Sequence, residues 1–380
     1  MKKAYLVSCF NYYDNRIKYW EKYLNNNDYE IEYITSNFDH ISKKQIKIDR
    51  DNVIQIKTLK YSKNISIKRI LSHLLFSLRV YKYLKRKDKD FVYVMIPPNF
   101  LLYFLSKLKK TNQFKLVADI FDVWPETFPI KDKPFMKLPF YLWKKIRTIS
   151  FHNVDFVITE CDLYQEVLLE ELNHVPKKTL YLTKDFKVKQ TKILRNKKNI
   201  ELCYLGSINN IIDIDLIISL LKKINLERKV SLNIIGDGEN REIFLRELDR
   251  EKISYKFHGK LFLDEDKYKI LYNCDFGLNI MKNEVTVGLT MKSMDYFASY
   301  LPIINNINGD TKNLVRKYDA GFNIDSETLD IVAERIVNIS ELEIDSMKKR
   351  VKKMHERLFS YSSFMENVDD IFKKIEEVGK

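Results

Sequence analysis

The sequence has no long hydrophobic run, and this absence excludes a membrane-spanning helix. The longest candidate, residues 100–108, is about half of the roughly 18 residues that such a helix needs, and two lysines follow it directly. The first residues, Met-Lys-Lys and then Ala-Tyr-Leu-Val-Ser, lack the apolar core and small-residue cleavage site of a signal peptide. We therefore expect a cytoplasmic protein.

Residues that build disulfides and metal centres are also scarce. The four cysteines stand far apart without a Cys-x-x-Cys pair, which indicates buried, reduced thiols. The six histidines show no ligand spacing, and the nearest approaches to an Asp-x-Asp metal motif, residues 213–215 and 264–266, fall within or at the start of expected helices. We therefore expect no bound metal and no cofactor.

Positive charge is in excess, and the excess lies in the first half of the chain. The net charge is +14; residues 1–190 contain 35 Lys and Arg against 21 Asp and Glu, whereas residues 191–380 contain 31 of each. The basic residues gather with aromatic and aliphatic ones in residues 67–89 and 131–147. Such surfaces suit an anionic bilayer, so we expect a peripheral position at the inner face of the plasma membrane. The alternative is a solvated helix face with its aromatic side chains turned into the core.

Short apolar, β-branched runs alternate with amphipathic segments along the chain, which predicts an α/β fold with parallel sheets and crossover helices. A lysine-rich polar segment predicts a linker over 186–199. We expect two Rossmann-like, doubly wound domains facing a central cleft, residues 1–185 and 200–360, and a C-terminal helix, 361–380, that packs back toward the first domain. The expected strands are residues 4–8, 31–35, 53–56, 91–96, 115–119, 155–159 and 179–182, then 201–205, 231–235, 255–258, 276–280, 302–305 and 322–324.

One segment of the second half combines a glycine turn, a helix start and charged side chains. A loop containing Gly288 follows an expected strand, and a helix begins near Met291 with Thr290 as its N-cap. A diphosphate at this helix end meets free N–H groups and the helix dipole. Asp295 lies three residues after Lys292 on the same face, where a carboxylate can accept both ribose hydroxyls. The alternative is a buried helix whose Lys and Asp form a surface pair.

Residues 288–304 read Gly-Leu-Thr-Met-Lys-x2-Asp-Tyr-x-Ala-x3-Pro-Ile-Ile, and this run resembles the donor-site signature of family-4 glycosyltransferases. Three glycine-ended strands upstream, residues 204–207, 235–238 and 257–260, agree with the family frame. Residues 119–126, Asp-Ile-Phe-Asp-Val-Trp-Pro-Glu, are similar to a segment of the bacterial capsule, exopolysaccharide and lipopolysaccharide members. The likeness covers roughly residues 90 to 325.

The resemblance implies a GT-B fold and a retaining, metal-independent transfer of a sugar to a saccharide acceptor. The basic, aromatic-rich first half fits an acceptor that is lipid-linked. The first domain would bind the acceptor and the second a nucleotide sugar, a UDP- or dTDP-sugar. Cationic side chains and a helix dipole would neutralise the leaving diphosphate. A nucleic-acid partner is not expected, since no nucleic-acid motif accompanies the charge.

The resemblance also assigns residues to roles. The catalytic assignments are Lys292, which would bind the donor phosphates, and Asp122. The loop after the first strand would lie at the cleft with Asn11, Tyr12 and Arg16, the last near the phosphates. The expected donor contacts are Gly206, Ser207, Lys260, Lys282, Gly288, Leu289, Thr290, Met291, Lys292 and Asp295.

Four departures from the family pattern matter. Val287 stands where the first of two acidic residues is usual, with Glu284 as a substitute if the loop folds back. No cation follows Gly206, and the usual glycine-rich first loop of the N-terminal domain is missing. Phe121 replaces a frequent histidine, which moves the expected polar group to Asp122. A loop-capping role around the Trp-Pro dipeptide is the alternative for that aspartate.

These departures keep other functions open. A non-catalytic GT-B scaffold or activator subunit of another glycosyltransferase is the main alternative, and turnover would separate it from an enzyme. A sugar-nucleotide epimerase on the same scaffold would need acidic and histidine groups around the sugar carbons, which the sequence does not offer.

Overall fold

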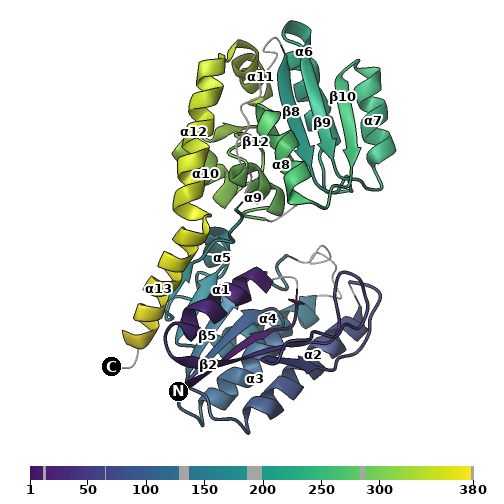
Figure 1. Ribbon diagram of the computed structural model, residues 1–380. Coiled ribbons are helices and arrows are strands. Elements are labelled where there is room, and N and C mark those ends of the chain that lie inside the picture. Colours follow the sequence, from purple (N-terminus) through teal and green to yellow (C-terminus); the bar gives the residue numbers. More distant parts are fainter. Residues whose placement is uncertain (12–13, 65, 128–136, 186–198, 283–286, 378–380) are drawn as a thin grey trace. The chain divides into compact units, whose positions relative to one another are not determined.

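The chain folds into two units, each built on a parallel β-sheet (Figure 1). The computed structural model describes residues 1–11, 14–64, 66–127, 137–185, 199–282 and 287–377. The first unit comprises Met1–Tyr181 with Met365–Lys380, and the second comprises Leu182–Phe364. The expected linker, 186–199, lies outside the described residues except for its last position.

Within the described residues, the first unit has a seven-stranded sheet in the order β3-β2-β1-β4-β5-β6-β7. Its strands are β1 Lys2–Ser8, β2 Tyr29–Ser36, β3 Val53–Ile56, β4 Phe91–Ile96, β5 Lys115–Ile120, β6 Phe156–Thr159 and β7 Lys177–Thr179. Its helices are α1 Asp14–Asn25, α2 Ile67–Leu84, α3 Asn99–Lys109, α4 Lys137–Phe151 and α5 Asp162–Val167, joined by most of α13 Tyr361–Glu377.

The central strand β4 is buried along its whole length because helices cover both faces of the sheet. Helices α2, α3 and α4 pack side by side on one face (Figure 1). On the other face, α1 packs against β2, and its Tyr23 contacts α13. The Tyr23 hydroxyl donates to Asp369 at 2.8 Å, and its ring lies 5.3 Å from that of Phe372. The last helix is thereby part of the core of the first unit.

In the part of the second unit that the structure describes, the architecture repeats with six parallel strands in the order β10-β9-β8-β11-β12-β13. The strands are β8 Ile200–Leu205, β9 Val230–Ile235, β10 Ser254–Gly259, β11 Phe276–Asn279, β12 Ile303–Asn305 and β13 Gly321–Asn323. The helices are α6 Ile214–Glu227, α7 Arg241–Arg250, α8 Asp264–Asn273, α9 Met291–Ala298, α10 Asp310–Tyr318, α11 Leu329–Asn338 and α12 Glu341–Leu358.

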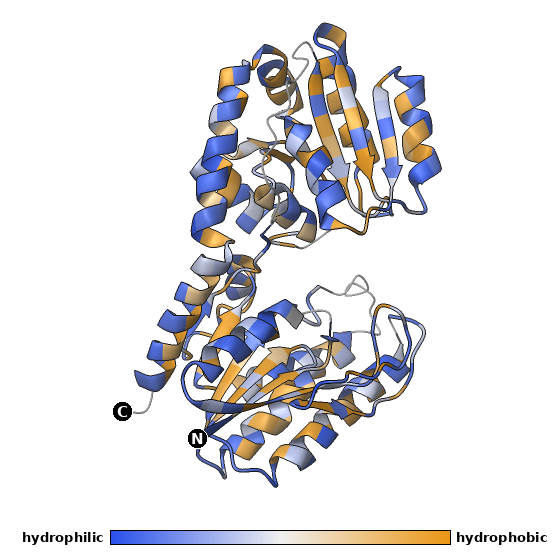
Figure 2. Ribbon diagram, in the orientation of Figure 1, coloured by the Kyte–Doolittle hydropathy of each residue, from blue (hydrophilic) through white to orange (hydrophobic). Residues whose placement is uncertain are grey.

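Hydrophobic side chains concentrate in the inner strands of both sheets (Figure 2). In the second unit, α11 packs on α6, whereas α12 packs on α9 and α10. The strands of the second sheet are short and apolar because helices cover both faces of a parallel sheet. Their carboxyl ends carry glycine or polar residues, and the candidate site is built there. Among the described residues, no helix combines the length and the apolar content needed to cross a membrane.

Candidate functional site

Helix α9 begins at the carboxyl edge of the second sheet with the expected N-cap. The Thr290 Oγ1 accepts a hydrogen bond from the Ser293 N–H at 3.1 Å. The same hydroxyl donates to Asn279 Oδ1 at 3.1 Å, so it points into the unit rather than toward a ligand. Because the first N–H groups of a helix have no intrahelical acceptor, those of Met291 and Lys292 are left to meet an anion.

A buried amide network holds the strands below α9. The side chains of Asn279 and Asn305 end adjacent strands, β11 and β12, and both are fully buried. The Asn279 amide donates to Ser293 Oγ at 3.0 Å and to Asn305 Oδ1 at 2.8 Å. The Gly288 carbonyl is bound by Thr311 from α10, which fixes the loop before the helix. The sequence signal that was missed is an asparagine at the end of two neighbouring buried strands.

Tyr296 anchors α9 to the sheet. Its buried hydroxyl accepts from the Leu205 N–H at 2.8 Å, at the end of β8. Its ring covers Gly277, where a Cβ atom would lie 2.7 Å from the ring carbon Cδ1. The residue at position 277 must therefore be glycine for the helix to approach so closely. This anchor brings Lys292 to the glycine loop that follows β8.

Lys292 lies across that loop, and the described residues place no counter-ion beside it. Its Nζ is 4.8 Å from the centroid of the Tyr204 ring, and its Cε is 3.9 Å from the position that a Cβ on Gly206 would occupy. Within the described part of the chain, no carboxylate pairs with this ammonium. Burial lowers the pKa of Lys292 to about 8. An anionic ligand would supply the missing charge and restore the protonated form.

The loops after β8 and β9 pack directly on each other through glycines. Gly206 has φ +131° and Gly236 has φ +134°. A Cβ on Gly236 would lie 1.9 Å from the Gly206 carbonyl oxygen, and the Gly206 N–H donates to Ile235 O at 2.9 Å. Ser207 is exposed beside this contact. Lys292 therefore lies beside Gly206, and the donor-binding roles of Gly206, Ser207 and Lys292 remain predictions.

Asp295 has a partner that the sequence did not indicate. Its Oδ1 lies 3.3 Å from the Lys184 Nζ, which also pairs with Asp264 at 2.9 Å. Burial raises the pKa of Asp295, and the nearby Lys184 opposes that rise. A ribose at Asp295 must share the carboxylate with Lys184 or displace it.

The remaining donor candidates lie at strand ends in the same unit. Lys260 and Lys282 are exposed and follow β10 and β11. The Lys282 N–H donates to Ile211 O at 2.8 Å, which fixes the backbone but leaves the ammonium to solvent. Val287 is half-buried, and Glu284 lies outside the described residues.

The structure corrects the expectation for Arg16. Its guanidinium is 3% exposed and pairs with Asp119, with Nε–Oδ2 at 2.6 Å and Nη2–Oδ1 at 3.0 Å. Its Nη1 donates to Leu180 O at 2.8 Å. The guanidinium ties α1 to two strand ends inside the first unit instead of reaching a phosphate. Asn11, which is close to Arg16 in the sequence, is half-buried, and Tyr12 lies outside the described residues.

Asp122 caps its own loop. It accepts from Trp124 Nε1 at 2.5 Å and from Thr127 Oγ1 at 2.7 Å, and burial raises its pKa. Glu126 binds the buried Arg147 through both oxygens, at 2.7 and 2.8 Å. The structure therefore contains the loop-capping arrangement that stood as the alternative. The catalytic role of Asp122 remains a prediction.

Glu160 is a carboxylate that sequence reasoning missed. It follows β6, next to the end of β5, and its N–H donates to Ile120 O at 2.9 Å. Its buried Oε2 has no hydrogen-bond partner. Burial raises the pKa of Glu160 to about 8, with Arg16 opposing the rise and Asp119 adding to it. The available signal was an acidic residue directly after a buried strand at the same edge as Asp122.

In the described part of the basic stretch 131–147, which begins at Lys137, the aromatic side chains divide between core and solvent. Phe140 and Trp143 are buried, whereas Tyr141 is 61% exposed. Trp143 packs on Trp124, with ring centroids 5.8 Å apart. One expected face therefore becomes two, an inner aromatic face and an outer face with exposed lysines.

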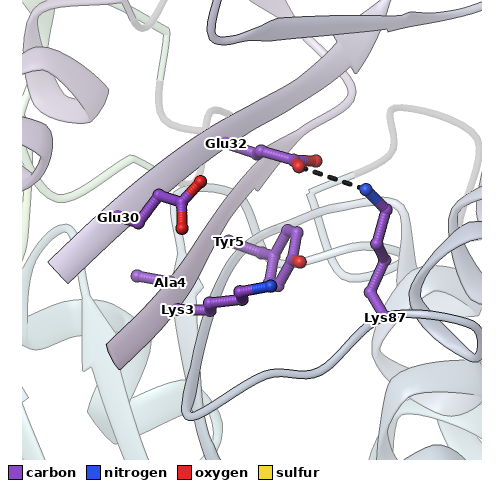
Figure 3. Close-up of a pocket in the computed structure, with 6 residues that line it drawn as sticks. All are labelled: Lys3, Ala4, Tyr5, Glu30, Glu32 and Lys87. Carbon is purple, nitrogen blue, oxygen red and sulfur yellow. Dashed lines mark hydrogen bonds and ion pairs between the residues drawn. The ribbon is translucent and has the colours of Figure 1, made fainter. Parts of the chain in front are cut away.

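A small pocket of the first unit does not resemble a ligand site. It lies at the amino-terminal ends of β1 and β2, away from the carboxyl edge (Figure 3). Its charged side chains neutralise one another, as the Lys87–Glu32 pair at 3.3 Å illustrates (Figure 3). Among the described residues, no three His, Cys, Asp or Glu side chains gather in a metal-binding group. Metal independence itself remains a prediction.

Known proteins share this architecture. Residues 199–341 match the family model described as Glycosyl transferases group 1. Sucrose-phosphate synthase from Thermosynechococcus elongatus superposes with a TM-score of 0.70, at 10% identity, over 99% of this chain and 100% of that one. HepE from Anabaena, solved with UDP, gives 0.67 at 12% identity over 98% and 100%. The lipopolysaccharide outer core galactosyltransferase WaaB gives 0.67 at 14% identity over 98% and 99%.

No sequence among curated proteins matches the chain. The expected GT-B fold of two Rossmann-like domains is confirmed. The group match and the fold support the resemblance to GT-B glycosyltransferases, whereas membership of family 4 in particular remains a prediction.

Proposed function

We propose that the chain is a retaining glycosyltransferase that moves a sugar from a nucleotide donor, a UDP- or dTDP-sugar, to a lipid-linked saccharide acceptor. The observation that carries the proposal is the ammonium of Lys292 at the start of α9, beside the glycine loop of β8, which pairs with no carboxylate of the described residues. A diphosphate is the ligand that such a position favours, because it accepts from the helix N–H groups and neutralises the lysine. The analogy with HepE, which was solved with UDP, supports the nucleotide. The analogy with WaaB, a lipopolysaccharide galactosyltransferase, supports the pathway.

The residues of the second unit define how the donor would react. Lys292 and the N–H groups of Met291 and Lys292 would stabilise the charge that develops on the leaving diphosphate, without a metal. Gly206 and Ser207 would allow the phosphates to approach the backbone, with Lys260 and Lys282 as further phosphate contacts. Asp295 would accept the ribose hydroxyls. Fixed dipoles and cations act here by being in place before the reaction.

A membrane location is proposed for the first unit. Large apolar side chains are exposed at the start of α2, where Ile67 is 77% exposed, and at the start of α4, where Leu138 is 66% exposed. Exposed lysines flank both helix starts, for example Lys68 and Lys137. Exposed apolar groups among basic ones fit the interface of an anionic bilayer. We therefore place the protein in the cytoplasm at the inner face of the plasma membrane, acting in cell-surface polysaccharide synthesis.

The first test is a thermal-shift screen with UDP-, dTDP- and GDP-sugars, with Lys292→Ala as the control. A ligand that binds only the folded chain raises its melting temperature. We expect a rise with one nucleotide class that disappears in Lys292→Ala. No rise with any nucleotide would remove the donor site and favour a non-catalytic GT-B scaffold.

Turnover tests the proposed transferase activity, and vesicle binding tests the proposed membrane location. Release of the nucleoside diphosphate with a lipid-linked saccharide acceptor distinguishes an enzyme from a scaffold that binds the donor but does not transfer it. Binding to vesicles with anionic lipid should exceed binding to neutral ones at moderate salt, and Ile67→Glu with Leu138→Glu should reduce it. Equal binding to both vesicles would contradict the membrane location.

A further inference from the structure

Lys184 brings a positive charge to the carboxylate that is proposed for the ribose. Its Nζ lies 3.3 Å from the Asp295 Oδ1 and 2.9 Å from the Asp264 Oδ2. Lys184 lies at the start of the second unit, whereas Asp264 begins α8 and Asp295 belongs to α9. The fold of this unit therefore places a lysine that is distant in the sequence beside a residue of the candidate site.

The backbone of Lys184 is fixed against the end of α12. Its N–H donates to the Phe359 carbonyl oxygen at 3.2 Å, and its own carbonyl oxygen accepts from the His355 Nε2 at 2.6 Å. His355 is buried, and the next residue of the chain, Asp185, accepts from the Tyr361 N–H at 2.8 Å. Because both backbone groups of Lys184 are bound, its side chain extends toward α9 from a fixed point.

The two carboxylates beside Lys184 differ in how far they depend on it. Asp264 has one lysine on each oxygen, because Lys267 lies 2.6 Å from its Oδ1. Among the described residues, Lys184 is the one cation within ion-pair distance of Asp295. Loss of the Lys184 ammonium would therefore leave Asp264 paired but would remove the counter-ion of Asp295.

Burial makes the ionised form of Asp295 costly, and Lys184 offsets part of that cost. The Asp295 side chain is 16% exposed, and burial raises its pKa. Lys184 opposes this rise, Lys267 opposes it less, and Asp264 adds to it. An ionised carboxylate accepts about four hydrogen bonds, whereas protonation turns one oxygen into a donor. The neighbouring lysine thus favours the form of Asp295 that accepts from both ribose hydroxyls.

We propose that Lys184 is a positioning residue of the donor site, which holds the Oδ1 of Asp295 and leaves its Oδ2 to accept from the ribose of the nucleotide. The inference rests on the proposed function, in which α9 binds a nucleotide sugar. A lysine on one oxygen leaves enough acceptor capacity for two hydroxyls. The ribose therefore shares Asp295 with Lys184 and does not displace it.

The test compares the affinities of UDP and 2′,3′-dideoxy-UDP by calorimetry on the full chain, over a range of pH. The ratio of the two affinities isolates the ribose hydroxyls, because both nucleotides carry the same diphosphate. The unsubstituted chain should prefer UDP about tenfold above the pKa of Asp295. Lys184→Met should lose most of this preference, and the remainder should vanish at a higher pH, because removal of the ammonium raises the pKa of Asp295.

Two further variants separate positioning from a general effect of charge. Lys184→Arg keeps the cation and should restore the preference for UDP. Lys269→Met removes an exposed lysine of α8 that pairs with Asp266 at 3.5 Å, and it should keep both the preference and its pH dependence. An equal loss in Lys184→Met and Lys269→Met would overturn the positioning role.

The outcomes for this residue and for the donor site are distinguishable. If Lys184→Met keeps the preference and the pH profile of the unsubstituted chain, the positioning role is wrong and the donor site stands. If UDP does not bind the unsubstituted chain, the proposed function is wrong and this inference is wrong with it.

Chemical acetylation covers the case in which Lys184→Met does not fold, since it needs no substitution. The Lys184 side chain is 24% exposed, so a small acylating reagent can reach its amine. UDP should slow the acetylation of Lys184 more than 2′,3′-dideoxy-UDP does, as measured by mass spectrometry, and should leave the exposed Lys269 unchanged. Faster or unchanged acetylation of Lys184 with UDP would show that the ribose does not share Asp295 with it, and would overturn the proposal.

Discussion

The ammonium of Lys292 lies 4.8 Å from the centre of the Tyr204 ring and faces no carboxylate within the described residues. A buried lysine with only a ring beneath it is a cost to the folded state, because folding removes the charge from water. The same feature makes the position receptive to an anion. Stability and donor binding should therefore respond to Lys292 in opposite directions.

Lys292→Met should raise the free energy of unfolding by about 1–3 kcal/mol at pH 7 and remove the response to nucleotides. The folded pKa of about 8 lies below the unfolded value of 10.5, so the unsubstituted chain gains stability as pH rises from 8 to 10.5. The difference between the two proteins should shrink across that window in denaturant titrations. Lys349→Met, at an exposed position in α12, should show neither effect; a Lys292→Met protein less stable at pH 7 would contradict the argument.

The role proposed for Asp295 can be tested with the ribose itself. UDP should bind the unsubstituted chain about tenfold more tightly than 2′,3′-dideoxy-UDP, since the hydroxyls donate to a partly buried carboxylate. In Asp295→Ala this preference should vanish, whereas Asp266→Ala in the exposed first turn of α8 should keep it. Calorimetry with both nucleotides on the three proteins gives the comparison. An unchanged preference in Asp295→Ala would assign the ribose to another residue.

Gly236→Ala should destabilise the second unit by about 2–4 kcal/mol. The new Cβ would lie 1.9 Å from the carbonyl oxygen of Gly206, at φ +134°. Gly259→Ala is the control, because φ there is +65° and no atom lies within 4 Å of its Cβ position; about 1 kcal/mol is expected. Equal losses for the two variants in chemical denaturation would show that the loops separate easily.

The buried carboxyl of Glu160 predicts a pH-dependent stability. Its folded pKa of about 8 lies above the ordinary 4.5, so the folded state binds a proton that the unfolded state releases, and stability falls as pH rises from 4.5 to 8. Glu160→Gln stays neutral, so its free energy of unfolding should match that of the unsubstituted chain at pH 5. At pH 8.5 it should be higher by roughly a few kcal/mol. The exposed Glu170→Gln should show no such divergence. Parallel stability curves for Glu160→Gln would contradict a desolvated carboxyl.

Local sequence patterns determined the regular elements of this protein. The expected strands 53–56 and 91–96 agree with β3 and β4 at both ends, and the helix predicted from Met291 begins there with Thr290 as its cap. Apolar runs, helical periodicity and capping hydroxyls act over a few residues, so a single sequence contains them. The expected C-terminal helix, residues 361–380, corresponds to α13, which begins at Tyr361 and ends at Glu377.

Tertiary structure decided which charged side chains are available to a ligand. Arg16 and Lys292 are both cations at the start of a helix, yet Arg16 is buried against Asp119, 103 residues away, while Lys292 meets the Tyr204 ring and no carboxylate of the described residues. Lys184 reaches Asp295 in the same way. Sequence spacing fixes where a residue sits on its own helix, but the partner of a charge depends on which distant strand ends the fold brings together. The sequence alone therefore determined the elements and the helix that carries the candidate site, and the packing of the sheets decided the partners of its charges.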